Sequence, residues 1–247
     1  MKNRPIFLFS SNAEVDKWNE KVLREMPGTE AVSEASDHVA GDGSESAKRV
    51  ILLSVNNDRV TTQQTMGLPR VLQLKVGARY MMTYNLDTSD GLTNGATGRL
   101  VHIDMSQQRP GINAPRKPLR VWMVFDEPTV GTNLRRRYSA IIAGLQHPPD
   151  WTPLEPTTVT IKRNKSSNLQ VLRKQFPMVP AEAIAIHKSQ GQTCASVVHK
   201  ARRMTRALLY VVLSCVTSLA GLFIIGFFVP PKKPHPNDPL QRQDRCC

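Results

Sequence analysis

The sequence predicts an α/β fold that is interrupted by a small β-rich insertion, and three observations support this. A short apolar stretch, Ile6 to Phe9, is followed by a segment with the apolar periodicity of a helix. From Leu72 onward the chain consists of short β-type runs separated by Gly, Asn and Pro turns. A second apolar strand, Ala183 to Ile186, runs into a loop of small, hydrogen-bonding residues, so the α/β pattern resumes there.

The first segment, RPIFLFSSNAEVDKWNEKVLREMPG, predicts a strand and then a helix that begins after an Asn12 cap. Pro27 and Gly28 end that helix. Its apolar positions repeat at helical spacing: Val15, Trp18, Val22 and Leu23. The next stretch, Thr29 to Lys48, is rich in Ser, Glu, Asp, Ala and Gly and has no apolar period. We therefore expect a mobile surface loop in that stretch.

The middle of the chain predicts a small barrel, because its β-type runs are short and regularly broken. The runs are LQLKVGARYMMTYNLD, GLTNGATGRLVHID, PLRVWMVFDEP and TVTIKR. Basic residues cluster in this region in two places: Arg135, Arg136 and Arg137, then Lys162, Arg163 and Lys165. Two interpretations of these clusters stay open, namely a solvated charged face and a surface that follows a phosphate backbone.

The stretch AEAIAIHKSQGQT is the most informative part of the sequence, since ligands of open α/β sheets bind where strands end. Gly191 would let the backbone approach a phosphate closely. Ser189, Gln190, Gln192 and Thr193 supply side-chain hydrogen bonds. An ordinary polar turn with Lys188 in solvent is the alternative. His187 predicts no metal site, because no second ligand follows it at helical spacing.

Charge and cysteine content narrow the partners and the compartment. Lys and Arg number 33 against 20 Asp and Glu, which gives a formal net charge of +13. A polyanion is therefore the expected partner, with nucleic acid ahead of an anionic membrane surface. The four cysteines form no CxxC pair and no N-terminal signal peptide is recognisable, so we expect a reducing compartment and a protein that is not secreted.

The uncharged apolar run from Ala207 to Val229 is long enough for a membrane span, which needs roughly 20 residues. Arginines precede the run and lysines follow it, so the flanking charges favour neither orientation. Burial within a protein core is the other interpretation, and the run by itself leaves both open.

Four segments, taken in order, resemble superfamily 1B DNA helicases of the PIF (petite integration frequency) type, relatives of RecD and of Helitron transposon helicases. FLFSSNAEVDKWNEKVLREMPG resembles motif IV, and LPRVLQLKVGARYMMTYNLDTSDGLTNGATGRLV resembles the opening of the inserted 2B domain. AIAIHKSQGQT resembles motif V, and TRALLYVVLSCVTSLAGLFIIG resembles motif VI. Together these segments cover most of the chain from Pro5 to Gly226.

The resemblance implies a RecA-like 2A domain, of the P-loop NTPase type, interrupted by an SH3-like 2B barrel. Its expected divisions are 1–66 for the first part of 2A, 67–175 for 2B, 176–229 for the rest of 2A, and 230–247 for a disordered Pro-rich tail. Motif VI of the family is an amphipathic helix, a turn and a buried strand. The run Ala207 to Val229 accommodates that division, which argues against a membrane span.

The resemblance also implies a function: the C-terminal part of an ATP-dependent, 5′-to-3′ DNA helicase that acts in the nucleus or mitochondrion. ATP and Mg²⁺ are the implied cofactors and single-stranded DNA is the implied partner. The sequence contains no GxxxxGK[ST] loop, so we expect this chain alone to be inactive. A first RecA-like domain would have to be supplied in trans.

Site roles carried over from the family fall on the motif V loop and on motif VI. DNA contacts fall on His187, Lys188, Ser189, Gln190 and Thr193, and the nucleotide cleft on Gly191 and Gln192. Cys215 occupies the position of the family's arginine finger, whose loss costs on the order of 1,000-fold in turnover. We further expect His199 and Lys200 to cut short the strand after motif V.

Two other function classes remain open beside the helicase. The chain could be a non-catalytic single-stranded nucleic-acid binding module, or a decayed transposon-derived copy of a helicase. It could also be a membrane-anchored basic protein that uses Ala207 to Val229. Salt-dependent binding without an ATP effect would identify the binding module, and solubility without detergent would exclude the membrane-anchored protein.

Overall fold

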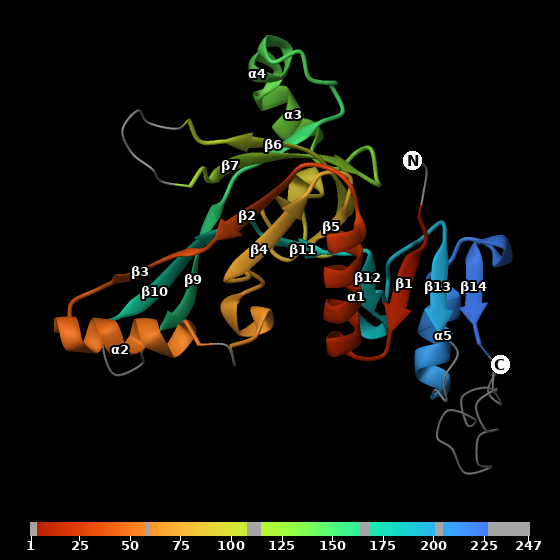
Figure 1. Ribbon diagram of the computed structural model, residues 1–247, viewed down its shortest axis with the longest axis horizontal. Coiled ribbons are helices and arrows are strands. Elements are labelled where there is room, and N and C mark those ends of the chain that lie inside the picture. The colour runs from red at the N-terminus through yellow and green to blue at the C-terminus, as the bar shows by residue number, and fades with distance from the viewer. Residues whose placement is uncertain (1–3, 58–59, 108–114, 164–167, 201–204, 227–247) are drawn as a thin grey trace. The chain divides into compact units, whose positions relative to one another are not determined.

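The computed structural model describes residues 4–57, 60–107, 115–163, 168–200 and 205–226 (Figure 1). These residues divide into two compact units. The first unit combines the described residues up to Lys17 with those from Ala183 onward, and the second unit runs from Trp18 to Glu182. The boundary falls inside helix α1, Asn12–Glu25, which follows the first strand as expected.

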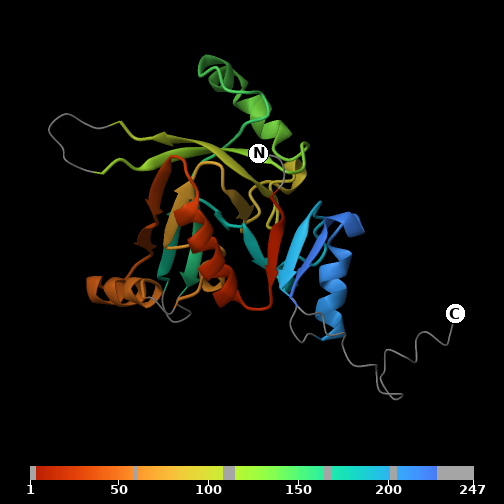
Figure 2. The same cartoon turned by 45° about the vertical axis from the view of Figure 1, so that its right-hand side comes forward.

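The first unit contains a four-stranded parallel sheet in the order β12-β1-β13-β14. Figures 1 and 2 show these strands side by side. Leu8 of β1 pairs with Ile184 on one side and with His199 on the other. Strands from opposite ends of the sequence are therefore neighbours at the centre of this sheet. The strands are β1 (Ile6–Phe9), β12 (Ala183–Ala185), β13 (Val197–Lys200) and β14 (Leu222–Ile225).

Strand β13 includes His199, so the expectation that His199 cuts this strand short is wrong, while residues 201–204, which follow Lys200, lie outside the described residues. Strand β13 continues to Lys200, and the His199 ring is buried. Its Nδ1 lies 3.0 Å from the carbonyl oxygen of Leu8. One ring nitrogen therefore has a hydrogen-bond partner, while Nε2 is buried without one among the described residues.

The apolar run near the C-terminus forms a helix, a turn and a strand, as the resemblance implied. Helix α5, Arg206–Ser214, begins after Thr205, whose Oγ1 accepts a 3.4 Å hydrogen bond from the Leu208 N–H. A 3-10 turn at Leu219–Gly221 leads into β14. In the part of the chain that the structure describes, no helix is long and apolar enough to cross a bilayer. Residues 227–229 of the run lie outside the described residues.

Strand β14 is not buried, which corrects one detail of that expectation. Phe223, Ile224 and Ile225 are 50%, 38% and 52% exposed. Within the described residues β14 pairs only with β13, so it forms an edge of the sheet. A strand at the edge of a sheet has a neighbouring strand on one side only, so more of its surface is exposed than that of a central strand.

The second unit is built mainly on a five-stranded antiparallel sheet in the order β11-β5-β6-β7-β8. Buried side chains such as Leu100, Met123 and Phe176 form its core. The predicted β-type runs are therefore strands, while a closed SH3-like barrel stays a prediction. The strands are β5 (Arg79–Met82), β6 (Thr97–Met105), β7 (Pro118–Phe125), β8 (Thr152–Leu154) and β11 (Met178–Pro180).

The expected loop at Thr29 to Lys48 is wrong for most of its length. Strand β2 (Glu30–Glu34) pairs with β4 (Val71–Lys75), and strand β3 (Ser36–Ala40) pairs with β10 (Gln170–Gln175). Both β2 and β3 are edge strands that are largely exposed, so they lack the apolar alternation that reveals a half-buried strand. Pairing with distant segments holds them in place.

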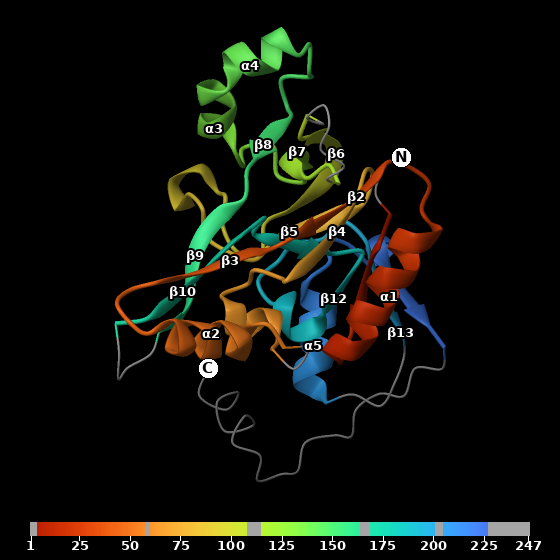
Figure 3. The same ribbon diagram turned by 60° about the vertical axis from the view of Figure 1, so that its left-hand side comes forward.

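Strands β3, β10 and β9 (Thr157–Arg163) form a separate three-stranded sheet, and helix α2 (Glu45–Val55) packs on it (Figure 3). Ser44 caps this helix by accepting a hydrogen bond from the Ala47 N–H. The contact between helix and sheet is an apolar cluster of Ile51, Val55, Ile161, Leu169 and Val171.

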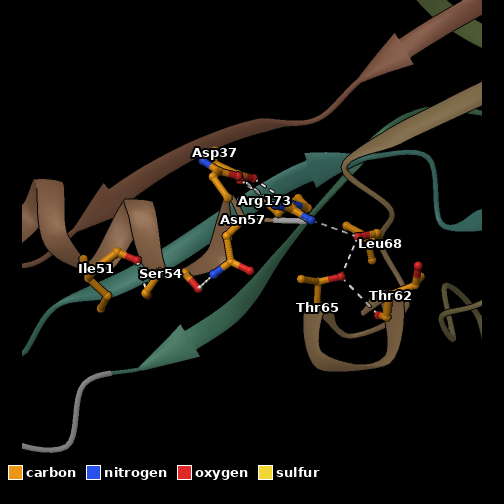
Figure 4. Close-up of polar contacts among 9 residues, drawn as sticks. Asp37, Ile51, Ser54, Asn57, Thr62, Thr65, Leu68 and Arg173 are labelled. Atoms are coloured by element: carbon orange, nitrogen blue, oxygen red, sulfur yellow. Dashed lines mark hydrogen bonds and ion pairs between the residues drawn. The ribbon is translucent and has the colours of Figure 1, made fainter. Parts of the chain in front are cut away.

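A buried ion pair also fixes this sheet (Figure 4). Arg173 is 1% exposed, and its Nε and Nη2 donate to the two carboxylate oxygens of Asp37 at 2.8 and 2.7 Å. Its Nη1 and Nη2 also donate to the carbonyl of Leu68 and the Asn56 side chain, each at 3.2 Å. The guanidinium therefore links β10, β3 and the two segments that flank the first 3-10 turn, Thr62–Thr65.

Replacing Tyr80 by Phe is expected to lower the free energy of unfolding by about 1–3 kcal/mol. The buried phenol oxygen accepts from the Lys75 N–H at 2.8 Å and donates to the Gln73 carbonyl at 2.9 Å, and the substitution removes both bonds. Burial raises the pKa of Tyr80 well above its usual value. Wild-type stability should therefore fall above pH about 10, where unfolded tyrosine ionises.

Urea denaturation at pH 7 and at rising alkaline pH measures both effects of the Tyr80→Phe change. Tyr210→Phe is the matched control, since Tyr210 is 72% exposed and should lose nothing measurable. Equal stabilities of the two variants would contradict the structural role of the Tyr80 hydroxyl.

Candidate functional site

The loop that follows β12 is held by its own backbone hydrogen bonds. A 3-10 turn, η3 (Ile186–Lys188), continues directly from the strand. The Ser189 N–H donates to the carbonyls of Ala185 and Ile186 at 3.2 and 3.1 Å, and the Gln192 N–H donates to Ser189 O at 2.9 Å. Gly191 has a φ of +78°, and no heavy atom lies within 4 Å of where a Cβ would be. Glycine is therefore favoured here by the left-handed backbone conformation, and not by a neighbouring atom that a Cβ would contact.

This loop presents to solvent most of the side chains that the sequence assigned to DNA. His187, Lys188, Gln190 and Thr193 are exposed. Gly191 is exposed and Gln192 is half-buried. One cation and several neutral hydrogen-bonding groups therefore share a single turn.

Ser189 differs from its neighbours because its side chain is fully buried. Its Oγ donates to the Ile186 carbonyl at 2.7 Å. In this geometry the hydroxyl cannot reach a ligand in solvent, so the expected direct contact with DNA is replaced by a contact inside the protein. Ser189 fixes the shape of the turn that carries the exposed groups.

Cys215 lies directly against this loop and not in solvent. It is the C-cap of α5 and is 1% exposed. Its Sγ donates to the Ser189 carbonyl at 3.0 Å and lies 3.3 Å from Ser189 Oγ. The position that the family resemblance assigned to the arginine finger is thus in contact with the centre of the motif V loop.

Backbone bonds at Cys194 complete the connection between the loop and α5. The Cys194 N–H donates to the Cys215 carbonyl at 2.7 Å, and the Thr217 N–H donates to the Cys194 carbonyl at 3.3 Å. Cys194 also forms a parallel bridge with Val216. Sequence reasoning missed Cys194, because nothing in its spacing reveals that it meets the end of a later helix.

The basic clusters of the second unit are partly structural. Arg135 donates to the Val130 carbonyl and to Thr152 Oγ1, at 2.7 and 2.8 Å, so it supports helix α3 (Thr132–Arg137) and β8. Lys162 donates to Ser54 Oγ at 2.7 Å. Lys165 lies outside the described residues. Arg135 and Lys162 therefore have partners within the protein, which reduces the surface available for following a phosphate backbone.

Comparison with known proteins gives consistent results along the chain. Residues 62–103 match the family model described as DNA helicase Pif1, 2B domain. The chain is 30% identical over 215 residues to the ATP-dependent DNA helicase PIF1 of Danio rerio, covering 87% of this chain and 26% of that protein. The protein of the same name from Homo sapiens is 30% identical over 213 residues, covering 85% of this chain and 25% of that protein.

Solved structures give the same result for the fold. The crystal structure of Pif1 helicase from Candida albicans matches with a TM-score of 0.58 at 26% identity, covering 91% of this chain and 46% of that chain. The structure of Pif1 helicase from Bacteroides in complex with ADP-AlF3 and ssDNA matches with a TM-score of 0.57 at 20% identity. The match covers 99% of this chain and 45% of that chain.

The parallel sheet and these neighbours place the chain in the class of RecA-like helicase folds. The strands and loops that carry motifs IV, V and VI lie within one such sheet unit. More narrowly, the chain belongs to the PIF1-type DNA helicases. It spans about a quarter of the length of the curated relatives it matches.

Proposed function

We propose that this chain is the part of an ATP-dependent, 5′-to-3′ PIF1-type DNA helicase that binds single-stranded DNA and couples DNA binding to the nucleotide site. The contact between Cys215 and Ser189 carries the proposal. It joins the motif VI helix end to the loop that presents the DNA-binding groups. A shift at either end is transmitted to the other through a buried contact and two backbone hydrogen bonds.

The exposed groups of the motif V loop suit a nucleic-acid backbone. Lys188 supplies a charge for one phosphate, while His187, Gln190 and Thr193 supply hydrogen bonds to phosphate or sugar oxygens. Such contacts position a strand without reading its sequence. The net charge of +13 adds a long-range attraction for DNA.

The residues present do not form a complete site for ATP and Mg²⁺. Cys215 has no cationic group and lies against Ser189, so it cannot neutralise a phosphate as an arginine would. In the proposed enzyme, Gly191 and Gln192 line the nucleotide cleft, and a first RecA-like domain, supplied in trans or by a longer chain, provides the main phosphate and metal site. The second unit is then the SH3-like 2B insertion.

Replacing Gln190 by Ala is expected to weaken binding of a single-stranded oligonucleotide about threefold to tenfold, since a lost hydrogen bond contributes about 0.5–1.5 kcal/mol. Lys188→Ala should weaken binding and also reduce the slope of log affinity against log salt by about one. Fluorescence anisotropy at low and at moderate salt measures both quantities.

Lys17→Ala is the matched control for the Lys188 variant, because it removes one exposed lysine from helix α1 of the same unit. It should leave the affinity nearly unchanged. If Lys17→Ala and Lys188→Ala weaken binding equally, the attraction comes from net charge and the proposed loop site is wrong.

A non-catalytic DNA-binding module is the second candidate, and a buried cysteine at position 215, in place of an arginine, favours it. In that case the chain binds single strands with the same loop, and nucleotide has no effect even when a first RecA-like domain is supplied. Repeating the anisotropy measurement with such a domain, with and without ATP, separates the two candidates.

A further inference from the structure

We propose that the second unit holds a divalent transition metal, with Zn²⁺ the best fit, on His102, Asp104 and His147. One ligand atom from each of these residues lies within 4.8 Å of the others. The site is independent of the DNA-binding loop, because all three residues belong to the second unit. The sequence predicted no metal site, and only His187 was considered as a ligand, because nothing in the sequence shows that His147 lies beside His102 and Asp104.

Strand pairing sets two of the three ligands. His102 and Asp104 are two residues apart on β6, so their side chains share one face of the sheet. His102 Nε2 lies 3.3 Å from Asp104 Oδ1. Two ligands of a tetrahedral zinc at bond lengths of about 2.1 Å are separated by about 3.4 Å. These two atoms are therefore already spaced as a bound ion requires.

The third ligand comes from the end of helix α4, Ser139–Gly144. Gln146 has a φ of +54°, its N–H donates to the Ala143 carbonyl, and the His147 N–H donates to the Ile142 carbonyl. This is the bonding pattern of a Schellman helix end. The motif turns the chain back and fixes the backbone of His147.

His147 supplies the observation that most favours a metal. Its Nε2 is buried and has no hydrogen-bond partner among the described residues. A buried polar atom without a partner costs about 1–3 kcal/mol. A metal ion bound at this nitrogen would satisfy it.

Neighbouring groups orient the ligands in the way that outer partners of metal sites do. The Trp122 Nε1–H donates to Asp104 Oδ2 at 3.0 Å, which leaves Oδ1 facing His102. The ring of Trp151 lies 4.7 Å from that of His147 and 6.2 Å from that of His102. Both imidazoles are thereby held against an aromatic surface.

Charge around the site is compatible with a cation. Arg120 lies 3.6 Å from Asp104 Oδ2, but its shorter contact, 2.7 Å, is to Glu155. The second carboxylate therefore offsets the positive charge of the guanidinium. An open depression of about 670 Å³, lined by His102, Asp104 and Leu145 among others, gives an ion and its water access.

Two imidazoles and one carboxylate are the donor set of zinc sites that keep a position for water. Bound metal would tie the loop after α4 to strand β6. We expect one equivalent of Zn²⁺ to bind to the metal-free full chain in calorimetry and to raise its melting temperature, because the ion binds only the folded site. Co²⁺ should bind with the spectrum of nitrogen and oxygen ligands, without thiolate bands, and should quench the fluorescence of the adjacent tryptophans.

Two variants, His102→Gln and His147→Gln, test the assignment. Each should weaken Zn²⁺ binding at least tenfold and abolish the Co²⁺ quenching. His38→Gln is the matched control, because this exposed histidine lies on β3 and is not part of the cluster. It should bind as the wild type does.

Near-UV circular dichroism checks that each variant is folded. If His147→Gln does not fold, His102→Gln still decides the question, since its side chain is 47% exposed and contributes little to the core. Unchanged affinity in a folded His102 variant, thiolate bands with Co²⁺, or no binding by the wild type would each overturn the proposal.

Discussion

Arg173→Ala is expected to lower the free energy of unfolding by about 3–5 kcal/mol, which is the usual cost of removing one partner from a buried ion pair. The substitution leaves the Asp37 carboxylate charged in a site where its side chain is only 6% exposed. It also leaves the Leu68 carbonyl and the Asn56 side chain without this donor. Since domains are stable by only about 5–15 kcal/mol, much of the second unit's stability would be lost.

Urea denaturation followed by circular dichroism measures this loss. Arg137→Ala is the control, because Arg137 pairs with Asp87 at 3.6 Å but its side chain is 63% exposed. An exposed ion pair of this kind contributes little to stability, because solvent screens it. Similar losses in the two arginine variants would show that the Arg173 pair is solvated in solution.

A double variant, Arg173→Met with Asp37→Leu, separates burial of a lone charge from loss of the attraction itself. Replacing both partners of a buried pair by apolar side chains is often nearly neutral. We therefore expect the double variant to be more stable than Arg173→Ala. A double variant that is no more stable than Arg173→Ala would mean that the lone Asp37 charge is not the main cost of the single substitution.

Gly221→Ala is expected to destabilise the parallel sheet by about 3 kcal/mol or more, at the upper end of overpacking costs. An added Cβ would lie 2.1 Å from the carbonyl oxygen of Ala195, a distance at which one backbone must move. Neither backbone is free to do so. The Gly221 N–H is bonded to Ser218 O, and the residue after Ala195 accepts a hydrogen bond from Ile6 N.

Hydrogen exchange of the β13 and β14 amides is the most direct measurement, because the clash lies where both strands begin. Gly191→Ala is the informative contrast, since a Cβ there meets open space and only the positive φ is unfavourable. That cost is about 1–2 kcal/mol. If Gly221→Ala protects its amides as well as Gly191→Ala does, the close approach to Ala195 is not present in solution.

The sequence predicted most of the elements whose pattern is local. Strand Ile6–Phe9, helix Asn12–Glu25 and strand Ala183–Ala185 lie where the apolar runs predicted them. The Asn12 cap is wrong, because Asn12 is the first residue of the helix and the Glu14 N–H donates to Ser11 Oγ at 3.3 Å. Helix α5 and strand β14 likewise divide the apolar run that could have been a membrane span. Strands β2 and β3 were missed, because exposed edge strands carry no alternating signal and depend on partners far along the chain.

The candidate site shows the same division. Sequence reasoning found the motif V loop because Gly191 and its polar neighbours are contiguous. It also identified Cys215, through the family resemblance, as the position of the arginine finger. The structure adds that the Cys215 thiol contacts Ser189.

By itself, the sequence determined the α/β class, the basic charge and the contiguous loop that carries the proposed DNA contacts. Only the tertiary structure decided that Ser189 is buried, that Cys194 and Cys215 join the loop to a helix, and that His102 and His147 meet. Periodicity and capping act over a few residues and can be read from the chain. Contacts between distant residues depend on strand order and packing, which no local pattern encodes.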